Sequence, residues 1–593
     1  MVAMNVKLFQ ASFDSEKLLV AAIDFGTTFS SWAFSFKHDY QCNPTKVFLK
    51  SWNSGKGISQ KAPTTVLIRP DGKTLEAFGY KAEDRYAELV ASDEHRKWYY
   101  FSRFKMALYA DRRLNRGKLI ADEIGRKLPA MTVISRVIDH LRKDLLSESS
   151  KQISGGVPEE SIHWVLTVPA IWNDKARQFM REAATEAGIQ NEQLTIALKP
   201  EAASIFCRYI PLQAIISDGK KAIVPLTEGI RYIVIDAGGG TVDITVHEVM
   251  DNGNQKELHK ATGGAWGGQE VDECFRQFLI KIFGGPVLQE FKKEAMDDYI
   301  AIFRDFELKK RNIVPYGESK CVMSLPLTLV EIFENRTKEK LTDAIAQGPF
   351  ASKLELLKGN KLRIDNLVVR SFFDKAVKSA ADHIQTFHDA SDRFGISVAL
   401  VVGGFSESPM LIIALRSVCP SWNFVVPDDA GLVVLKGAVL FGHNPSAITY
   451  RICKYTYGKS TTEIFRDGVH PEEFRLTSPD GKHRCGYIFR TLIEEGKLFK
   501  CGDVVYDETS HPLEDRNSFD TCIYTSTDKN PTYTTDDCCT FLGKLRIDDL
   551  DMNIPRKKRN CRVIISFGNT ELRIESTDVN TGKRLKASFD ILQ

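Results

Sequence analysis

The feature that most constrains the fold of this chain is a strand–turn–strand pattern that occurs twice. The first copy spans residues 18–36, LLVAAIDFGTTFSSWAFSF, and the second spans residues 232–249, YIVIDAGGGTVDITVHEV. In each copy a short apolar strand leads into an aspartate and a turn of small residues, and a second β-rich strand follows. Because the pattern recurs after about 210 residues, we expect two related halves, each opening with such a unit.

The chain has 593 residues, which is too long for one hydrophobic core, since single cores stop growing near ~250–300 residues. We expect three or four compact units. Up to about residue 446 strands and helices alternate, which is typical of sheets with helical cover. The predicted strands are 165–168 and 397–402, and the predicted helices include one capped by Asn173 or Asp174 and two over 291–312 and 366–390. After residue 446 short β-prone runs predict a separate all-β unit.

Composition excludes several function classes. The 80 basic and 77 acidic residues leave a net charge of only +3, whereas a nucleic-acid-binding protein is usually more basic. The N-terminus has no secretory signal pattern, and the apolar runs are far shorter than the ~20 residues that span a bilayer. The 12 cysteines include no C-x-x-C pair, so we expect reduced thiols. These features predict a cytoplasmic protein without a membrane span.

The two turns have the chemistry of a phosphate site. Glycine lets the backbone approach an anion closely, and the hydroxyls of Thr27, Thr28 and Thr241 add donors. Asp24 and Asp236 carry the same charge as phosphate, but their carboxylates are suited to Mg²⁺. Two such turns facing one another across a crevice are expected to hold the phosphates of a nucleotide and its metal.

Either turn alone is weak evidence, because residues 24–28 also fit a plain β-hairpin. The two turns in order, followed by a strand that runs into Gly403 and Gly404, favour the phosphate site. The chain has no G-x-x-x-x-G-K-[ST] sequence, so a P-loop is excluded.

Four motifs together resemble the superfamily of actin, sugar kinases and heat-shock ATPases: DFGTT at 24–28, VPAIWND at 168–174, DAGGGTVD at 236–243 and VVGGFSESP at 401–409. VPAIWND and the later GGQEVD at 267–272 are similar to the 70-kDa heat-shock family. The FSESP segment and FKMAL at 104–108 resemble its atypical 12A/12B branch. The resemblance is strong over residues 18–445 and weak beyond them.

The resemblance implies an α/β, two-lobed actin-like ATPase fold with duplicated halves, followed by a β-sandwich-like domain without a helical lid. The expected divisions are an N-terminal extension over 1–17, lobe I over 18–228, lobe II over 229–428, a return to lobe I over 429–445 and a β-rich substrate-binding-like domain over 446–593.

The resemblance also implies roles for individual residues. Those expected around the phosphates are Gly26, Thr27, Thr28 and Phe29 from lobe I and Gly238, Gly239, Gly240 and Thr241 from lobe II. Asp24 and Asp236 would position Mg²⁺ through water, and Lys105 matches the catalytic lysine, so Lys105 and Asp236 are the catalytic candidates. The residues expected near the nucleoside are Glu307, Lys310, Arg311, Gly403, Gly404, Phe405 and Glu407, with Asp428 near the return to lobe I. Without the family match, Glu307, Lys310 and Arg311 would suggest a solvated charged face.

The chain departs from the family at its metal and base sites. Lys199 stands where the family has a glutamate that orders water and cations. Two like unit charges ~4 Å apart repel by about 4 kcal/mol at an effective dielectric of 20. Lys199 is therefore expected to weaken Mg²⁺ binding or to meet phosphate directly, unless it turns to solvent. Phe405 and Glu407 replace a serine and an adenine-sandwiching arginine. A glutamate cannot sandwich the base in this way, whereas Phe405 offers a stacking face.

The leading interpretation is an ATP/ADP-binding, atypical heat-shock-like protein that binds protein segments through its C-terminal domain and hydrolyses ATP slowly. Whether it is a weak ATPase is left open. The alternative is a pseudo-ATPase scaffold in signalling or in a stress or immune response. A small-molecule kinase of the same superfamily is disfavoured by the β-rich C-terminal unit. Residues 447–455 lack the family's acidic and leucine-rich linker, so nucleotide is expected to change client affinity little.

Overall fold

The computed structural model describes residues 17–585, with gaps at 56, 110, 112, 154–155, 211–212, 216–220, 224, 318–319, 391–393, 479–480, 508–516, 549, 556–557, 568–571 and 583. Apart from Lys17, the predicted N-terminal extension lies outside the described residues. Both predicted strand–turn–strand units are present. Strands β1 (Leu19–Asp24) and β2 (Phe29–Phe36) form one antiparallel pair, and β16 (Arg231–Ala237) and β17 (Val242–Val249) form the other.

Each pair lies in its own sheet. The first sheet has the order β13-β12-β1-β2-β3, with β6 beside β2, and its further strands are β13 (Leu194–Leu198), β12 (Ile162–Val168), β3 (Phe48–Leu49) and β6 (Ala62–Pro63). The second has the order β15-β14-β23-β22-β16-β17-β18-β24-β28. Its further strands are β15 (Lys221–Ile223), β14 (Gln213–Ile215), β23 (Asn423–Val425), β22 (Val398–Val402), β18 (Gln255–Gly264), β24 (Ile448–Ile452) and β28 (Leu498–Lys500).

The aspartates of the two turns occupy equivalent strand positions. β1 runs parallel to β12, and β16 runs parallel to β22. Asp24 and Asp236 lie at or next to the carboxyl ends of β1 and β16, where ligands of open α/β sheets generally bind. This shared local arrangement agrees with the repeated sequence pattern, and the duplication of whole halves stays a prediction.

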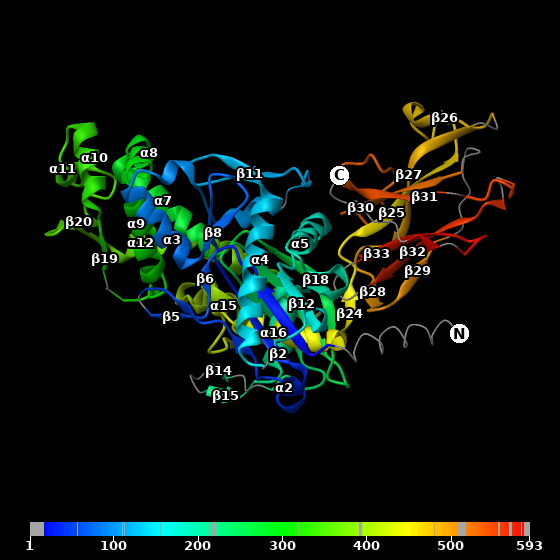
Figure 1. Cartoon of the computed structure of the whole chain (residues 1–593), viewed down its shortest axis with the longest axis horizontal. Helices are drawn as coiled ribbons and strands as arrows, with labels where there is room; N and C mark the ends of the chain where they lie inside the picture. The colour runs from blue at the N-terminus through cyan, green and yellow to red at the C-terminus, as the bar shows by residue number, and fades with distance from the viewer. Residues whose placement is uncertain are drawn as a thin grey trace.

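Helices pack between and around the two sheets (Figure 1). α6 (Lys199–Cys207) and α16 (Val433–His443) share one core cluster with buried residues of β1 and β16. The two helices touch at Gly437, where a Cβ would lie 1.7 Å from the Ala202 carbonyl oxygen. The other helices are α2 (Lys37–Cys42), α3 (Tyr80–Ala91), α4 (Ala130–Ser150), α5 (Asp174–Glu186), α7 (Gly268–Phe283), α8 (Gly285–Glu294), α9 (Met296–Lys310), α10 (Leu327–Thr337), α11 (Leu341–Gln347), α12 (Asn366–Ser371), α13 (Asp374–Asp389) and α15 (Pro409–Val418).

Most predicted elements of this region are confirmed, but two helices are interrupted. Asn173 caps α5 as predicted, since its side chain accepts the Ala176 N–H at 2.9 Å. The predicted helix over 291–312 breaks at Ala295, between α8 and α9, where the backbone leaves the helical region. The predicted helix over 366–390 divides into α12 and α13 around the buried Phe372 and Phe373.

Smaller sheets complete this part of the chain. They consist of β4 (Trp52–Asn53) with β5 (Ile58–Ser59), β7 (Thr65–Ile68) with β8 (Leu75–Phe78) and β9 (Tyr99–Ser102), β10 (Leu119–Ala121) with β11 (Lys127–Pro129), and β19 (Cys321–Ser324) with β20 (Leu354–Leu357) and β21 (Lys361–Ile364).

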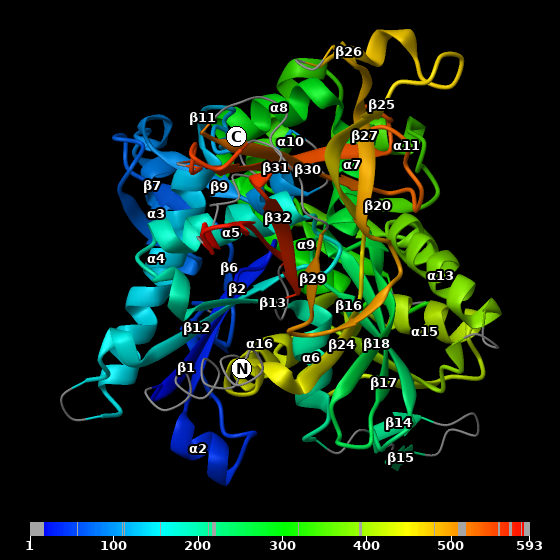
Figure 2. The same ribbon diagram turned by 90° about the vertical axis from the view of Figure 1, so that its right-hand side faces the viewer.

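The C-terminal part is rich in strands, as predicted, and lies at the right of Figure 1 and toward the viewer in Figure 2. One sheet has the order β26-β27-β25-β30-β31, formed by β26 (Arg475–Thr477), β27 (His483–Ile493), β25 (Thr456–Ile464), β30 (Phe519–Ser526) and β31 (Cys539–Ile547). The other has the order β29-β32-β33-β34, formed by β29 (Val504–Tyr506), β32 (Cys561–Phe567), β33 (Leu572–Asp578) and β34 (Arg584–Leu585). Buried residues of both sheets share one core cluster.

The junction between the two parts is a strand rather than an isolated linker. β24 continues the second sheet by pairing in parallel with β18, and β28 pairs with β24. The Arg451 guanidinium on β24 forms a buried ion pair with Glu201 of α6. The Lys454 ammonium donates to the Ile171 and Trp172 carbonyls at 2.8 and 3.1 Å. The second sheet therefore extends past residue 446, where the sequence predicts the start of a separate unit.

Glu257 of β18 makes the stability of this junction depend on pH. Its carboxylate accepts the Ile452 N–H at 2.8 Å, and burial, together with the nearby Glu201 charge, raises its pKa from 4.5 to about 8. Between these pH values the folded protein holds a proton that the unfolded chain has lost, so the stability that Glu257 contributes falls as pH rises.

We expect Glu257→Gln, which keeps an acceptor but cannot ionise, to be more stable than the wild type at pH 8.5, with the gain shrinking toward pH 5. The full effect is on the order of 2–4 kcal/mol. Thermal unfolding midpoints of both proteins at the two pH values provide the measurement. A constant difference between the proteins would contradict the assignment.

Within the described part of the chain, no helix combines the length and the apolar character needed to cross a bilayer.

Candidate functional site

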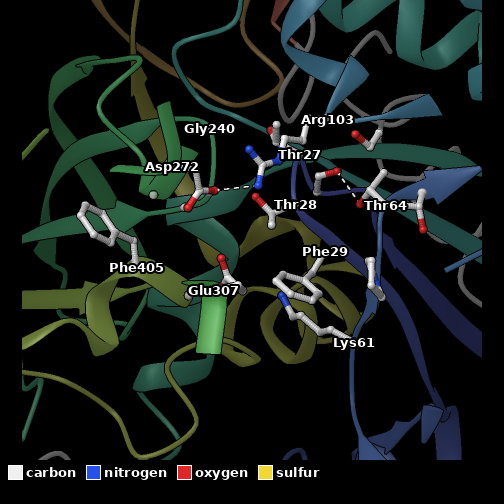
Figure 3. Close-up of a pocket in the computed structure, with 18 of the residues that line it drawn as sticks. Thr27, Thr28, Phe29, Lys61, Thr64, Arg103, Gly240, Asp272, Glu307 and Phe405 are labelled. Atoms are coloured by element: carbon white, nitrogen blue, oxygen red, sulfur yellow. Dashed lines mark hydrogen bonds and ion pairs between the residues drawn. The ribbon is translucent and has the colours of Figure 1, made fainter. Parts of the chain in front are cut away.

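The two glycine turns lie on a cleft of about 1030 Å³ between the two sheets. The predicted residues that line it are Asp24, Gly26, Thr27, Thr28, Phe29, Lys105, Lys199, Asp236, Gly238, Gly239, Gly240, Thr241, Glu307, Lys310, Arg311, Gly403, Gly404, Phe405 and Glu407. Asp428 does not line the cleft and is exposed in the segment before α16. A site of this volume is at the upper end of the range for small-molecule ligands. Figure 3 shows part of the lining.

The two turns meet directly across the cleft. A Cβ added to Gly239 would lie 1.9 Å from the Thr28 hydroxyl, and one added to Gly240 would lie 2.7 Å from the Thr27 hydroxyl. Any side chain at either glycine would therefore overlap the opposite turn. The buried Thr28 hydroxyl has no hydrogen-bond partner among the described residues. Burying an unpaired hydroxyl donor costs free energy, and a ligand that accepts a hydrogen bond would satisfy this donor.

Asp24 is held by three donors. Its Oδ1 accepts from the Lys199 ammonium at 2.8 Å and from the Thr167 hydroxyl at 2.7 Å, and its Oδ2 accepts from the Lys61 ammonium at 2.9 Å. Burial alone would raise the pKa of Asp24, but Lys199 and Lys61 hold it well below its usual range. Lys199 therefore does not turn to solvent, which was one of the three arrangements that the sequence left open.

Asp236 experiences a different environment from Asp24. Burial raises its pKa to about 7, and the negative charges of Asp243 and Asp24 add to this shift, while Lys199 opposes it. The charges of both Asp24 and Asp236 in turn raise the pKa of Lys199 against the effect of burial. Lys199 thus supplies positive charge to both aspartates that were predicted to position Mg²⁺.

Lys105, the predicted catalytic lysine, is fully buried, and its amine is already hydrogen-bonded within the protein. Its ammonium donates to the Phe25 carbonyl and lies 4.9 Å from the centre of the Trp172 ring. Burial and the nearby Lys199 charge hold its pKa well below the usual value. Lys105 reaches the cleft, but the structure ties its amine to the backbone of the first turn.

The end of the cleft predicted to hold the nucleoside is lined by linked charges. Lys310 pairs with Asp272 at 2.6 Å and with Glu307 at 2.5 Å. Arg103 pairs with Asp272 at 2.9 Å, and Figure 3 shows this pair. Arg311 pairs with Glu307 at 3.0 Å. Because Lys310 is buried, this group is not the solvated charged face that the three residues would otherwise suggest. Phe405 also packs into the core cluster that contains buried residues of β16, β17 and α7.

The sequence did not identify several residues that shape this site: Lys61, Thr64, Arg103, Thr167 and Asp272. Lys61 and Thr64 follow β5 in a segment without a motif. Thr64 hydrogen-bonds Ser30 at 2.8 Å and the Gly26 carbonyl at 3.0 Å, so it fixes the first turn. Asp272 does belong to the GGQEVD segment, which is the one signal that pointed to any of these residues.

The residues present fit a nucleotide better than they fit a metal ion. The close glycine turns, the unpaired Thr28 hydroxyl and the surrounding cations suit phosphate groups. For Mg²⁺ the fit is poor, because two ammonium groups already occupy the oxygens of Asp24. Across the described residues, no group of three or more His, Cys, Asp or Glu side chains is placed to hold a metal.

The sequence of the chain matches one protein-family model and several known proteins. The Hsp70 protein family model matches residues 112–299. The chain is 31% identical to heat shock 70 kDa protein 12A of Mus musculus over 97% of its own length and 92% of that protein. It is also 31% identical to the Homo sapiens 12A protein over the same shares of both chains. For heat shock 70 kDa protein 12B of Homo sapiens the identity is 31%, over 98% of this chain and 92% of the relative.

Proposed function

Because the chain belongs to the Hsp70 family, in the branch of the 12A and 12B proteins, we propose that it binds ATP and ADP in the cleft between its two sheets. The family generally binds nucleotide with Mg²⁺. The observation that carries the proposal is the direct meeting of the two glycine turns around the unpaired Thr28 hydroxyl. Lys61, Lys199 and Arg311 on the same cleft favour a polyanionic ligand.

Within this proposal each part of the cleft has a role. The phosphates lie against Gly26 to Phe29 and against Gly238 to Thr241, from the two lobes. The nucleoside lies toward Glu307, Lys310 and Arg311 on one side and Gly403 to Phe405 and Glu407 on the other. The divisions of the chain are those the sequence predicts: lobe I over 18–228, lobe II over 229–428, the return over 429–445 and the C-terminal domain over 446–593.

We further propose that hydrolysis is slow. A catalytic lysine acts by orienting the attacking water and offsetting charge that develops in the transition state. The amine of Lys105 is bonded to the Phe25 carbonyl, and its pKa is lowered by burial and by Lys199. The hydrogen bond uses one of the donors of Lys105, and the lowered pKa favours its uncharged amine, so Lys105 offers a reacting phosphate fewer donors and less charge. They also support the second candidate, a pseudo-ATPase scaffold whose nucleotide holds a shape that partners recognise.

Single-turnover measurements test nucleotide binding and hydrolysis separately. Excess protein is mixed with a trace of ATP labelled in the γ-phosphate, and bound ATP and released phosphate are followed in time. Binding with slow phosphate release supports the weak ATPase. Binding with release no faster than in free solution favours the scaffold, and absence of binding at saturating protein contradicts both.

The C-terminal domain is proposed to be a β-sandwich that binds extended protein segments. β26 and β31 form the edges of one of its sheets, and an edge strand offers backbone groups to an added strand. We expect binding of extended peptides with fast release, since affinity differences lie mainly in the dissociation rate. We also expect little difference between the ADP and ATP states.

Fluorescence anisotropy of labelled peptides with the full chain, in ADP and in ATP, measures both quantities. A large change in release rate between the nucleotides would contradict the weak-coupling prediction. Failure to bind any extended peptide would favour the scaffold.

A further inference from the structure

The carboxylate oxygens of Asp24, the aspartate of the first turn, are already occupied by hydrogen-bond donors. Its side chain is buried at the end of β1, and its two oxygens accept from Lys61, Lys199 and Thr167 at 2.7–2.9 Å. A carboxylate has about four acceptor positions, so three donors leave little capacity for the water shell of a metal. Mg²⁺ keeps several waters and requires near-octahedral geometry around it.

The two lysines that contact Asp24 come from separate parts of the chain. Lys199 is the first residue of α6 and follows β13, whereas Lys61 lies between β5 and β6. The chain therefore brings the two ammonium groups to one carboxylate from separate elements. Both lysines also line the cleft, beside Gly26, Thr27 and Thr28 of the first turn. Their side chains are 15% and 22% exposed, for Lys199 and Lys61 respectively, so both are reachable from the cleft.

The two lysines also match the charge of a divalent cation. Two ammonium groups carry the same total charge of +2 as one magnesium ion. Each ammonium has three donors, and the bond to Asp24 takes one of them, so both lysines retain donors for a phosphate. Lysine commonly binds phosphate as a point charge. Lys105 is not part of this pair, because its amine bonds to the Phe25 carbonyl.

We propose that the cleft binds its nucleotide as the metal-free di- or triphosphate, with the ammonium groups of Lys61 and Lys199 in the place of the divalent cation. Asp24 then positions the two lysines rather than a metal. This inference rests on the proposed nucleotide binding and makes it more specific. It also assigns a role to Lys61, which lies outside the sequence motifs.

Calorimetric titration of ADP into the full chain tests this, once in excess Mg²⁺ and once in EDTA. We expect the two affinities of the wild type to agree within about threefold. We expect Lys61→Met and Lys199→Met each to weaken binding in EDTA by at least ~10-fold, since each loses one charge-assisted contact. The Lys199→Glu protein should need Mg²⁺ for tight ADP binding, so its ADP affinity should be at least ~10-fold weaker in EDTA than in Mg²⁺.

Lys340→Met is the matched control, because Lys340 is exposed, pairs with Glu334 and does not line the cleft. Its ADP affinity should equal that of the wild type in both buffers. Binding by the wild type that is lost in EDTA would overturn the inference and leave nucleotide binding intact. Unchanged affinity of both methionine variants in EDTA would also overturn it. Absence of ADP binding in both buffers would instead contradict the proposed function itself. The wild-type comparison needs no variant, so it decides the question even if a variant fails to fold.

Discussion

Replacing Gly239 by valine is expected to weaken binding of ATP and ADP by about 100-fold or more, which corresponds to ~2.7 kcal/mol. Even a single added Cβ would lie 1.9 Å from the Thr28 hydroxyl and 2.8 Å from the Thr28 Cβ. The two turns would have to move apart, and the phosphate site that both of them form would be lost. Because the conflict lies at the surface of the cleft rather than inside a core cluster, the effect on global stability should be smaller than the effect on binding.

Gly285→Ala is the control for this variant. Gly285 is the first residue of α8, and a Cβ there meets no atom within 4 Å. Calorimetric titration of each protein with ADP, together with its thermal unfolding midpoint, separates lost binding from lost folding. A Gly239→Val protein that binds ADP as the wild type does would contradict the placement of phosphate between the turns.

The second large effect is expected at the junction between the two parts of the chain. Arg451→Met should destabilise the protein by ~3–5 kcal/mol, because it leaves the buried Glu201 carboxylate without its partner. The side chains of Arg451 and Glu201 are 7% and 2% exposed, so solvent does not reach the unpaired carboxylate unless the fold opens locally. Removing both charges in Arg451→Met/Glu201→Met should recover most of the loss, since no unpaired buried charge then remains.

Thermal unfolding and limited proteolysis measure this effect. In Arg451→Met we expect a lower unfolding midpoint and faster cleavage near residues 447–455, and in the double variant we expect both to return toward the wild type. Arg363→Met serves as the control, because Arg363 of β21 forms an exposed pair with Glu355 of β20, and such pairs contribute ~0–1 kcal/mol. If the double variant were as unstable as the single one, the ion pair would not be what fixes β24.

The parts of the site that the sequence predicted are those whose chemistry is local. Asp24 and Gly26 are two residues apart, and the apolar strand before them ends where the turn begins, so strand pattern and turn chemistry indicate the site together. The second turn, from Asp236 to Thr241, is recognisable for the same reason. Both turns line one cleft in the structure.

The parts that the sequence did not predict depend on partners far apart in the chain. Lys61 is 37 residues from Asp24 and Thr167 is 143 residues from it, and neither lies in a pattern that suggests a carboxylate partner. Lys199 is recognisable from the sequence because the family that the chain resembles has a glutamate at that position. Its placement, however, follows from the position of Asp24 at the end of β1 and not from its own neighbours in sequence.

The extension of the second sheet past residue 446 is not predicted from the sequence either, because it also depends on a partner that is distant in the chain. β24 carries a buried arginine, Arg451, whose partner Glu201 is 250 residues away. A strand of this kind does not show the apolar alternation by which half-buried strands are recognised. The sequence therefore does not predict a strand in this segment, although its backbone pairs with both β18 and β28.

A crystal structure of the full chain with ADP bound tests the proposed nucleotide site most directly. We expect the diphosphate to lie between residues 26–29 and residues 238–241, with the ammonium groups of Lys61 and Lys199 within hydrogen-bond distance of its oxygens. A saturated complex in which ADP lies outside this cleft, or in which the phosphates do not contact both glycine turns, would contradict the proposed binding of nucleotide between the turns.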